Sequence, residues 1–159
     1  MSTHSFILTP CQWLGEGKIV LNMVEEELSF FTRWNVSTKD STGLIECVQE
    51  IQVKGLSDIM MNQFLFTNFT PSSFSIELEN QALGKVIGAG VINDKVIGWE
   101  FRMPELGFEG FEFYEKQEDQ SYLMHAEYST TDQFRTLIKG KVWQPAKSSK
   151  PLQDINEKS

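Results

Sequence analysis

The most constraining feature of this chain is a hydrophobic pattern with a period of two residues. Phe30, Thr32 and Trp34 alternate with Ser29, Phe31, Arg33 and Asn35, and residues 73–79 repeat the pattern. Successive side chains of a β-strand point to opposite faces, whereas a helix would place apolar residues three or four positions apart. The pattern therefore predicts strands with one buried face and one face in water.

Polar turns divide the pattern into ten expected strands. Asn93-Asp94 and residues 117–120 mark two of these turns. No convincing helix of ten or more residues separates the strands, and parallel pairing would need such long crossovers, so we expect up-and-down antiparallel pairing. Ten twisted strands tend to close into a barrel, which removes exposed edges. The expected strands cover residues 16–23, 27–36, 44–54, 59–67, 72–80, 84–92, 95–103, 108–115, 121–130 and 134–143.

Two segments also fit a short helix. Residues 3–13 are expected to form a plug or a short helix before the first strand. Ser57-Asp58 could cap a helix over residues 59–66, but the Phe-rich sequence of that segment favours a strand. The sequence becomes polar and rich in Pro, Ser and Lys after Trp143. We therefore expect one barrel domain over residues 1–143 and a flexible tail over residues 144–159.

Length and charge exclude several classes of protein. A chain of 159 residues suits one domain, and its formal net charge of −8 disfavours binding to nucleic acid or to an anionic membrane surface. No apolar run reaches the roughly 18 residues that a transmembrane helix requires. Cys11 and Cys47 are the two cysteines, and the N-terminus lacks the features of a signal peptide. These observations favour a cytoplasmic protein without a membrane or nucleic-acid partner.

A few residues resemble a known superfamily. Trp13 is followed by Gly15 and Gly17 in the expected first strand, and Arg135 lies on the last one. This arrangement resembles the calycin superfamily, which includes the lipocalins, the fatty-acid-binding proteins and the haem-binding nitrobindin type. In that superfamily an N-terminal Trp packs across the closed end of the barrel, often under an Arg from a late strand. The Gly-x-Trp order of lipocalins is absent here. The resemblance implies a central cavity for a small apolar molecule.

Strand parity predicts which residues face the lumen of such a barrel, because alternate residues point inward. We take the more apolar face of each strand as the inner one. No Arg or Lys lies on that face, so the expected ligand is a small, neutral, apolar molecule. The alternative is that the aromatic side chains fill the barrel and leave no cavity. The predicted ligand-binding residues are Phe30, Trp34, Gln49, Asn62, Phe64, Phe66, Trp99, Phe101, Phe111, Phe113 and Tyr128.

The two strands over residues 95–115 allow a second register. If their opposite face points inward, Glu100, Arg102, Glu112 and Tyr114 meet in the lumen and could perform acid–base chemistry of the decarboxylase or isomerase type. The aromatic residues of these strands would then form an exterior face for association with another molecule. An enzyme and an interaction module are therefore the alternatives to a binding protein.

Other candidate motifs predict no catalytic, cofactor or metal site. His125 is expected on the outer face beside Glu127, and nothing supplies three or four metal ligands at a suitable spacing. The glycines of residues 84–90 lie inside a strand pattern, not before a helix, so they do not form a dinucleotide-binding motif. We therefore predict a non-enzymatic protein, monomeric or homodimeric, that binds a small molecule.

Overall fold

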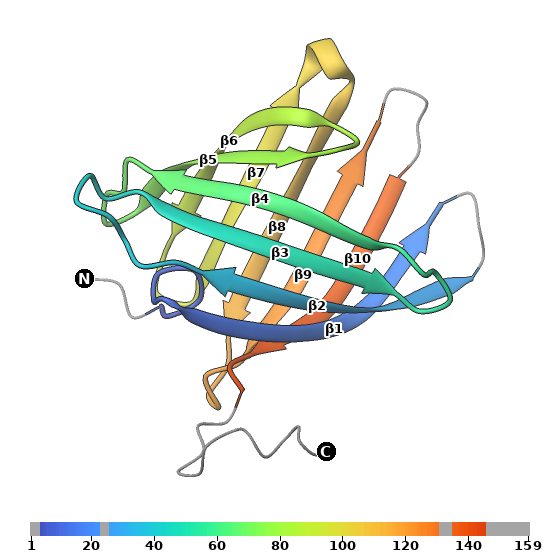
Figure 1. Ribbon diagram of the computed structural model, residues 1–159, viewed down its shortest axis with the longest axis horizontal. Helices are drawn as coiled ribbons and strands as arrows, with labels where there is room; N and C mark the ends of the chain where they lie inside the picture. Colours follow the sequence, from blue (N-terminus) through green and yellow to red (C-terminus); the bar gives the residue numbers. More distant parts are fainter. Residues whose placement is uncertain (1–3, 23–25, 131–134, 146–159) are drawn as a thin grey trace.

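The computed structural model describes residues 4–22, 26–130 and 135–145, and within them ten strands form a closed antiparallel barrel (Figure 1). The predicted all-β barrel is thus confirmed. The strands are β1 (Cys11–Leu21), β2 (Glu27–Val36), β3 (Ile45–Val53), β4 (Ile59–Thr67), β5 (Ser73–Asn80), β6 (Gly84–Ile92), β7 (Val96–Met103), β8 (Phe108–Lys116), β9 (Tyr122–Ser129) and β10 (Arg135–Trp143).

Each strand pairs with its neighbours in the sequence, and β1 closes the barrel by pairing with β10. Gly17 lies opposite Gly140 at this closure. Figure 1 shows β1–β5 crossing β7–β10 at a steep angle on the two walls, as expected for tilted strands in a closed sheet. In the circular order of strands, β3 lies across the lumen from β8, and β4 lies across from β9.

Both segments with helical potential adopt other structures. Residues 59–67 form strand β4, as the Phe-rich sequence predicted. Residues 6–10 form turns and bends. A 3-10 turn, η1 (Pro104–Leu106), lies between β7 and β8, and Gly107 ends it with a φ of 62°. Within the described part of the chain, no helix has the length and apolar character needed to span a membrane.

The N-terminal segment acts as a plug at one end of the barrel. Phe6 and Ile7 are fully buried. The ring nitrogens of His4 lie 2.8 Å from the Tyr122 hydroxyl and 2.6 Å from the Asn93 carbonyl oxygen. The plug is therefore fixed both by apolar packing and by hydrogen bonds. The predicted tail over residues 144–159 falls largely outside the described residues.

Inward-facing glycines allow aromatic rings to lie against the barrel wall. A side chain at Gly90 would overlap the ring of Phe74, and one at Gly88 would contact Phe101. A side chain at Gly110 would likewise overlap the ring of Tyr128. Gly88 and Gly90 thus serve close packing inside the barrel, in agreement with their predicted role, whereas Gly84 has open space around it and a φ of 72°.

Arg135 does not cover Trp13. Trp13 is fully buried beside Phe6 and Tyr122 at the plugged end. Arg135 is exposed at the start of β10, and its backbone N–H donates to the side chain of Asn22, beyond the far end of β1. The Trp–Arg contact expected from the resemblance is therefore absent, because the two residues lie at opposite ends of the barrel.

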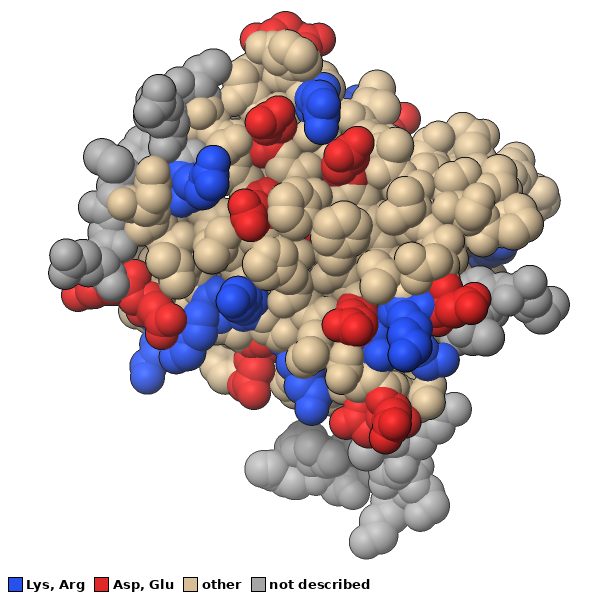
Figure 2. Space-filling view, turned by 180° about the vertical axis from the view of Figure 1, so that it is seen from behind, with Lys and Arg blue, Asp and Glu red and all other residues tan. Residues whose placement is uncertain are grey.

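The outer surface carries charges of both signs. Figure 2 shows Lys and Arg interspersed with Asp and Glu around an uncharged area on one face. Surface ion pairs join Arg33 to Glu50 at 3.5 Å and Lys141 to Asp119 at 3.8 Å. Because these side chains are exposed, such pairs contribute little to stability.

Candidate functional site

The plugged half of the lumen is filled by aromatic side chains. Phe6 lies with its ring centroid 4.4 Å from that of Tyr114 and 5.2 Å from that of Trp34. Trp34 stacks on Phe64 at 5.3 Å, and Trp99 packs against Tyr114 at 5.4 Å. Such offset and edge-on pairs combine large apolar burial with favourable ring geometry. The filled half forms the floor of the remaining lumen.

The other half of the lumen contains a cavity of about 440 Å³. This volume lies in the range of small-molecule sites, which is roughly 300–1,000 Å³. The alternative of a completely filled barrel is therefore wrong for this half. The cavity is lined by Ile19, Leu21, Leu28, Phe30, Gln49, Ile51, Val53, Met60, Asn62, Leu78, Asn80, Leu83, Phe108, Glu112, Met124, Tyr128, Thr136 and Ile138.

The predicted ligand-binding residues divide into three groups. The first group lines the cavity and comprises Phe30, Gln49, Asn62 and Tyr128. The second group is buried without lining the cavity and comprises Trp34, Phe64, Phe66, Trp99 and Phe101. The third group, Phe111 and Phe113, lies on the outer face, where Phe113 is 39% exposed. The inward placement predicted for these two Phe side chains is wrong.

The register of β8 explains this error. Trp99 faces inward and lies directly opposite Glu112 in the β7–β8 pair, and Tyr114 lies opposite Met124 in the β8–β9 pair. Directly opposed residues of an antiparallel pair point to the same face of the sheet. Glu112 and Tyr114 must therefore point inward, and Phe111 and Phe113 outward. On the outside, Phe113 covers Gly98, and Phe111 stacks on His125 at 5.9 Å.

The proposed four-residue acid–base cluster does not form. Glu112 and Tyr114 enter the lumen, but Glu100 and Arg102 stay outside. There they form an exposed ion pair with an N–O distance of 3.7 Å. Each of the two registers considered from the sequence is thus correct for one strand of the hairpin and wrong for the other.

Glu112 provides an acidic group inside the lumen. Its side chain lines the cavity and is 7% exposed. The Tyr114 hydroxyl donates to Glu112 Oε1 at 2.5 Å, and the Tyr128 hydroxyl donates to Glu112 Oε2. None of the described residues that line the cavity is Lys, Arg or His. The carboxyl group is thus held by two phenols and has no cationic partner in this lining.

Burial governs the ionisation of this cluster. It raises the pKa of Glu112 above its ordinary value, and the two phenol donors offset only part of this effect. Burial and the neighbouring Glu112 carboxylate raise the pKa of Tyr114 and of Tyr128 well above 10. Both phenols therefore keep their protons at neutral pH and remain hydrogen-bond donors.

A chain of side-chain amides crosses the wall opposite Glu112. The Leu83 N–H donates to Asn80 Oδ1 at 2.7 Å, and Asn80 Nδ2 donates to Asn62 Oδ1 at 2.9 Å. Asn62 Nδ2 donates to Gln49 Oε1 at 3.0 Å, and Gln49 Nε2 donates to the Thr32 hydroxyl at 3.1 Å. We call Gln49, Asn62 and Asn80 the amide belt. Because a backbone N–H can only donate, Leu83 fixes the direction of the whole belt.

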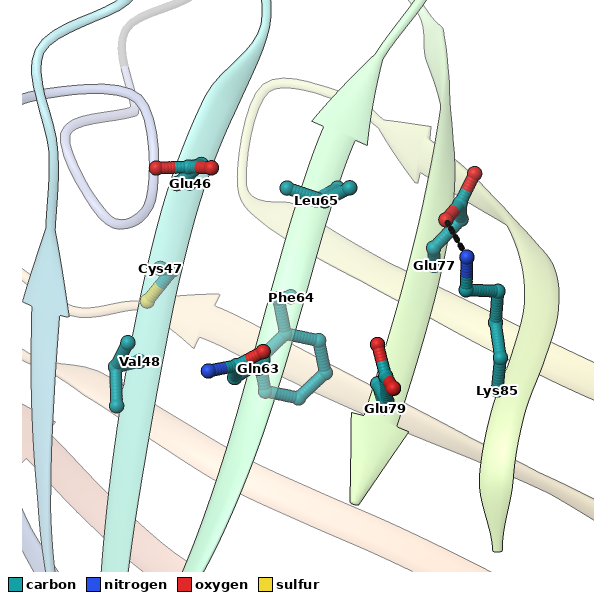
Figure 3. A pocket seen from close by; sticks show the side chains of 9 residues that line it. All are labelled: Glu46, Cys47, Val48, Gln63, Phe64, Leu65, Glu77, Glu79 and Lys85. Carbon is teal, nitrogen blue, oxygen red and sulfur yellow. Dashed lines mark ion pairs between the residues drawn. The ribbon is translucent and has the colours of Figure 1, made fainter.

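An outer hollow over β3–β6 is a weaker candidate (Figure 3). It measures about 220 Å³, half the volume of the interior cavity. Glu77 and Lys85 form an ion pair there at 3.8 Å, and both side chains are substantially exposed. Solvated side chains of this kind do not enclose a small molecule. The interior cavity is therefore the candidate site.

Other reactive side chains take no part in this cavity. Burial raises the pKa of Cys47 to about 12, which makes its thiol unreactive. His125 lies outside, with Nε2 at 3.4 Å from Glu127. Among the described residues, no three His, Cys, Asp or Glu side chains are grouped so that they could hold a metal ion.

The closed ten-stranded barrel with an internal cavity has a calycin-like fold. No protein-family model matches the chain, and no curated protein matches it in sequence. A solved structure does match it, that of the S-type phycobiliprotein lyase CPES from Guillardia theta, with a TM-score of 0.69. The match covers 93% of this chain and 95% of the lyase chain at 8% sequence identity. At this identity the similarity shows the fold alone.

Proposed function

We propose that the chain is a non-enzymatic binding protein that holds a small, largely apolar molecule in the interior cavity. The observation that carries this proposal is a cavity of about 440 Å³ with mostly aliphatic walls and few polar groups. Small-molecule sites typically have this composition, because apolar walls supply affinity and a few polar groups orient the ligand. The solved structure with the same fold is named as a lyase of phycobiliproteins, so a barrel of this architecture serves a dedicated biochemical role elsewhere.

Neutral apolar molecules are the simplest ligands for these walls. Transfer of such a molecule from water gains about 25 cal/mol for each Å² of apolar surface that it buries. A dye such as Nile red, which is neutral and fluoresces in apolar surroundings, tests the proposal directly. We expect saturable fluorescence that a second apolar compound displaces.

A pair of tryptophan substitutions provides the control. Ile138→Trp places a larger side chain in the cavity, whereas Ile87→Trp adds the same side chain on the outer surface, where Ile87 is 59% exposed. Dye binding should be lost in the first variant and retained in the second. If the wild-type protein binds no apolar dye, or if both variants bind it equally, the cavity is not the binding site.

Acid–base catalysis is a second candidate function, because Glu112 combines a raised pKa with two phenol neighbours in the cavity. A buried carboxyl group whose pKa is raised in this way can donate a proton to a bound molecule and recover it. Mass spectrometry of the molecule that copurifies with the protein, followed by incubation of that molecule with fresh protein, separates the two functions. Turnover that is lost in Glu112→Gln would favour the enzyme.

The cellular setting is also part of the proposal. We propose a cytoplasmic protein, in which both Cys11 and Cys47 remain free thiols as they are in the structure. A monomer or a homodimer is compatible with the exposed Phe113 on the outer face. Light scattering at increasing concentration distinguishes the two states.

A further inference from the structure

The chemistry of the cavity specifies its ligand further than apolar character alone. Glu112 is buried, each of its oxygens accepts one phenol hydrogen, and the described lining supplies no cation. A carboxylate has about four acceptor positions. Each oxygen of Glu112 can therefore accept one further hydrogen bond, and a cavity without cations leaves both positions to the ligand.

The wall opposite Glu112 carries the amide belt, whose polar groups are all neutral. Each amide of the belt accepts one hydrogen bond with its carbonyl oxygen and donates one N–H; its partners are the neighbouring belt amides and, at the ends of the chain of hydrogen bonds, the Leu83 N–H as donor and the Thr32 hydroxyl as acceptor. One N–H per amide is left over, because a side-chain amide carries two. The belt therefore offers neutral donors and neutral acceptors, whereas Glu112 is the acidic group of the described lining. A cationic group of a ligand meets only neutral amide oxygens at the belt, whereas at Glu112 it meets a carboxylate, which makes the stronger, charge-assisted hydrogen bond.

From this asymmetry we propose that the cavity binds apolar amines as ammonium ions, with the nitrogen at Glu112 and the apolar body between the two walls. This inference rests on the proposed function, since it names the ligand class of the same cavity. An ammonium ion donates to both oxygens of Glu112 while the two phenols keep their hydrogen bonds. If the carboxyl group is protonated before binding, its proton leaves to solvent and an ion pair remains.

Ligand anions are disfavoured by the same geometry. A ligand carboxylate would share an interior of low dielectric constant with Glu112 and would find no Lys, Arg or His among the described lining residues. A buried anion without a cationic partner is costly. The cavity should therefore rank three ligands of equal shape in the order amine, alcohol and carboxylic acid.

Three naphthalene compounds allow this test, because they share the ring system and differ in one polar group. We would measure the dissociation constants of 2-naphthylmethylamine, 2-naphthylmethanol and 2-naphthoic acid by calorimetry with the wild-type protein near neutral pH. The amine should bind at least about tenfold more tightly than the alcohol, the difference expected when a hydrogen bond becomes charge-assisted. The acid should bind more weakly than the alcohol.

Glu112→Gln tests whether Glu112 causes the ranking. This variant keeps the size of the side chain and removes its charge, so the amine should lose its advantage while the alcohol changes less than about threefold. Glu100→Gln makes the same chemical change on the exposed outer face and should leave all three constants unchanged. The ranking on the wild-type protein stands as a test even if the Glu112→Gln variant does not fold.

The outcomes separate this inference from the proposed function. If the alcohol binds in the cavity but the amine has no advantage, or if Glu112→Gln keeps that advantage, the amine proposal is overturned and the binding function stands. If neither the amine nor the alcohol binds, both the amine proposal and the proposed binding function are overturned. Binding of all three compounds with equal affinity would likewise refute a role for Glu112 in recognition.

Discussion

Glu112 should make the barrel less stable as the pH rises, and Glu112→Gln should remove this dependence. The carboxyl group is buried and its pKa is raised above the ordinary value of 4.5. Between 4.5 and the raised value, the folded state binds one proton more than the unfolded state. The free energy of unfolding therefore falls with increasing pH in this window. Below 4.5 both states are protonated, and above the raised pKa both are ionised, so the slope vanishes on either side.

The magnitude follows from the linkage relation. One proton of difference changes the free energy of unfolding by about 1.4 kcal/mol for each pH unit. The two phenols can still form hydrogen bonds with the neutral amide of the variant, because Gln offers one acceptor oxygen and two N–H donors. We therefore expect Glu112→Gln to resemble the wild type near pH 4.5, the ordinary pKa of the carboxyl group. As the pH rises from 4.5 to the raised pKa of Glu112, the variant should become more stable than the wild type by up to about 1.4 kcal/mol for each pH unit.

Urea unfolding between about pH 5 and about pH 8 measures this difference, with the fluorescence of the buried Trp13, Trp34 and Trp99 as the signal. Glu100→Gln is the control, since Glu100 is exposed and its replacement should not change the slope. A stability difference between wild type and Glu112→Gln that stays constant over this range would refute the reasoning. So would a difference that shrinks with rising pH.

Three further substitutions or reactions test other parts of the structure. Phe6→Ala should lower the free energy of unfolding by about 3–5 kcal/mol, since Phe6 is fully buried among four aromatic rings, and a loss below about 1 kcal/mol in urea unfolding would show that the plug is not part of the core. Gly110→Ala should displace the Tyr128 ring from the wall and cost about 1–3 kcal/mol by overpacking; an unchanged unfolding midpoint would contradict this. In the folded protein a thiol reagent near pH 8 should modify Cys11, which is partly exposed, much faster than the buried Cys47, whereas equal rates would contradict the predicted burial.

The barrel could be predicted from the sequence because the alternation of apolar and polar residues, bounded by polar turns, recurs in ten strands. Which face of a strand points into the lumen was harder to predict. On β8, for example, aromatic residues occur on both faces. Choosing the more apolar face placed Phe111 and Phe113 inside. Burial of apolar residues is a tendency that leaves many of them exposed, so it cannot decide between two faces that both carry rings.

The sequence left the direction of Glu112 open between two registers, and combining neighbouring strands could have decided it. Trp99 was correctly placed inside, and the four residues of the β7–β8 connection set Met103 opposite Phe108. Counting from that pair places Glu112 opposite Trp99 and hence inside. The amide belt was less accessible to prediction. Gln49 and Asn62 were expected to face inward, but their link to Asn80 and Leu83 depends on contacts between three strands and a turn.

The separation of the lumen into a filled half and an open half has a consequence for how this protein can change. Residues of the aromatic half are packed on all sides, so their replacement leaves voids or clashes. A residue such as Ile138 or Thr136 borders empty space on one side and has fewer neighbours to disturb. Substitutions in the open half should therefore alter ligand choice at small cost in folding. The barrel is thus a scaffold in which evolution or engineering can exchange the binding surface while the plugged end preserves the fold.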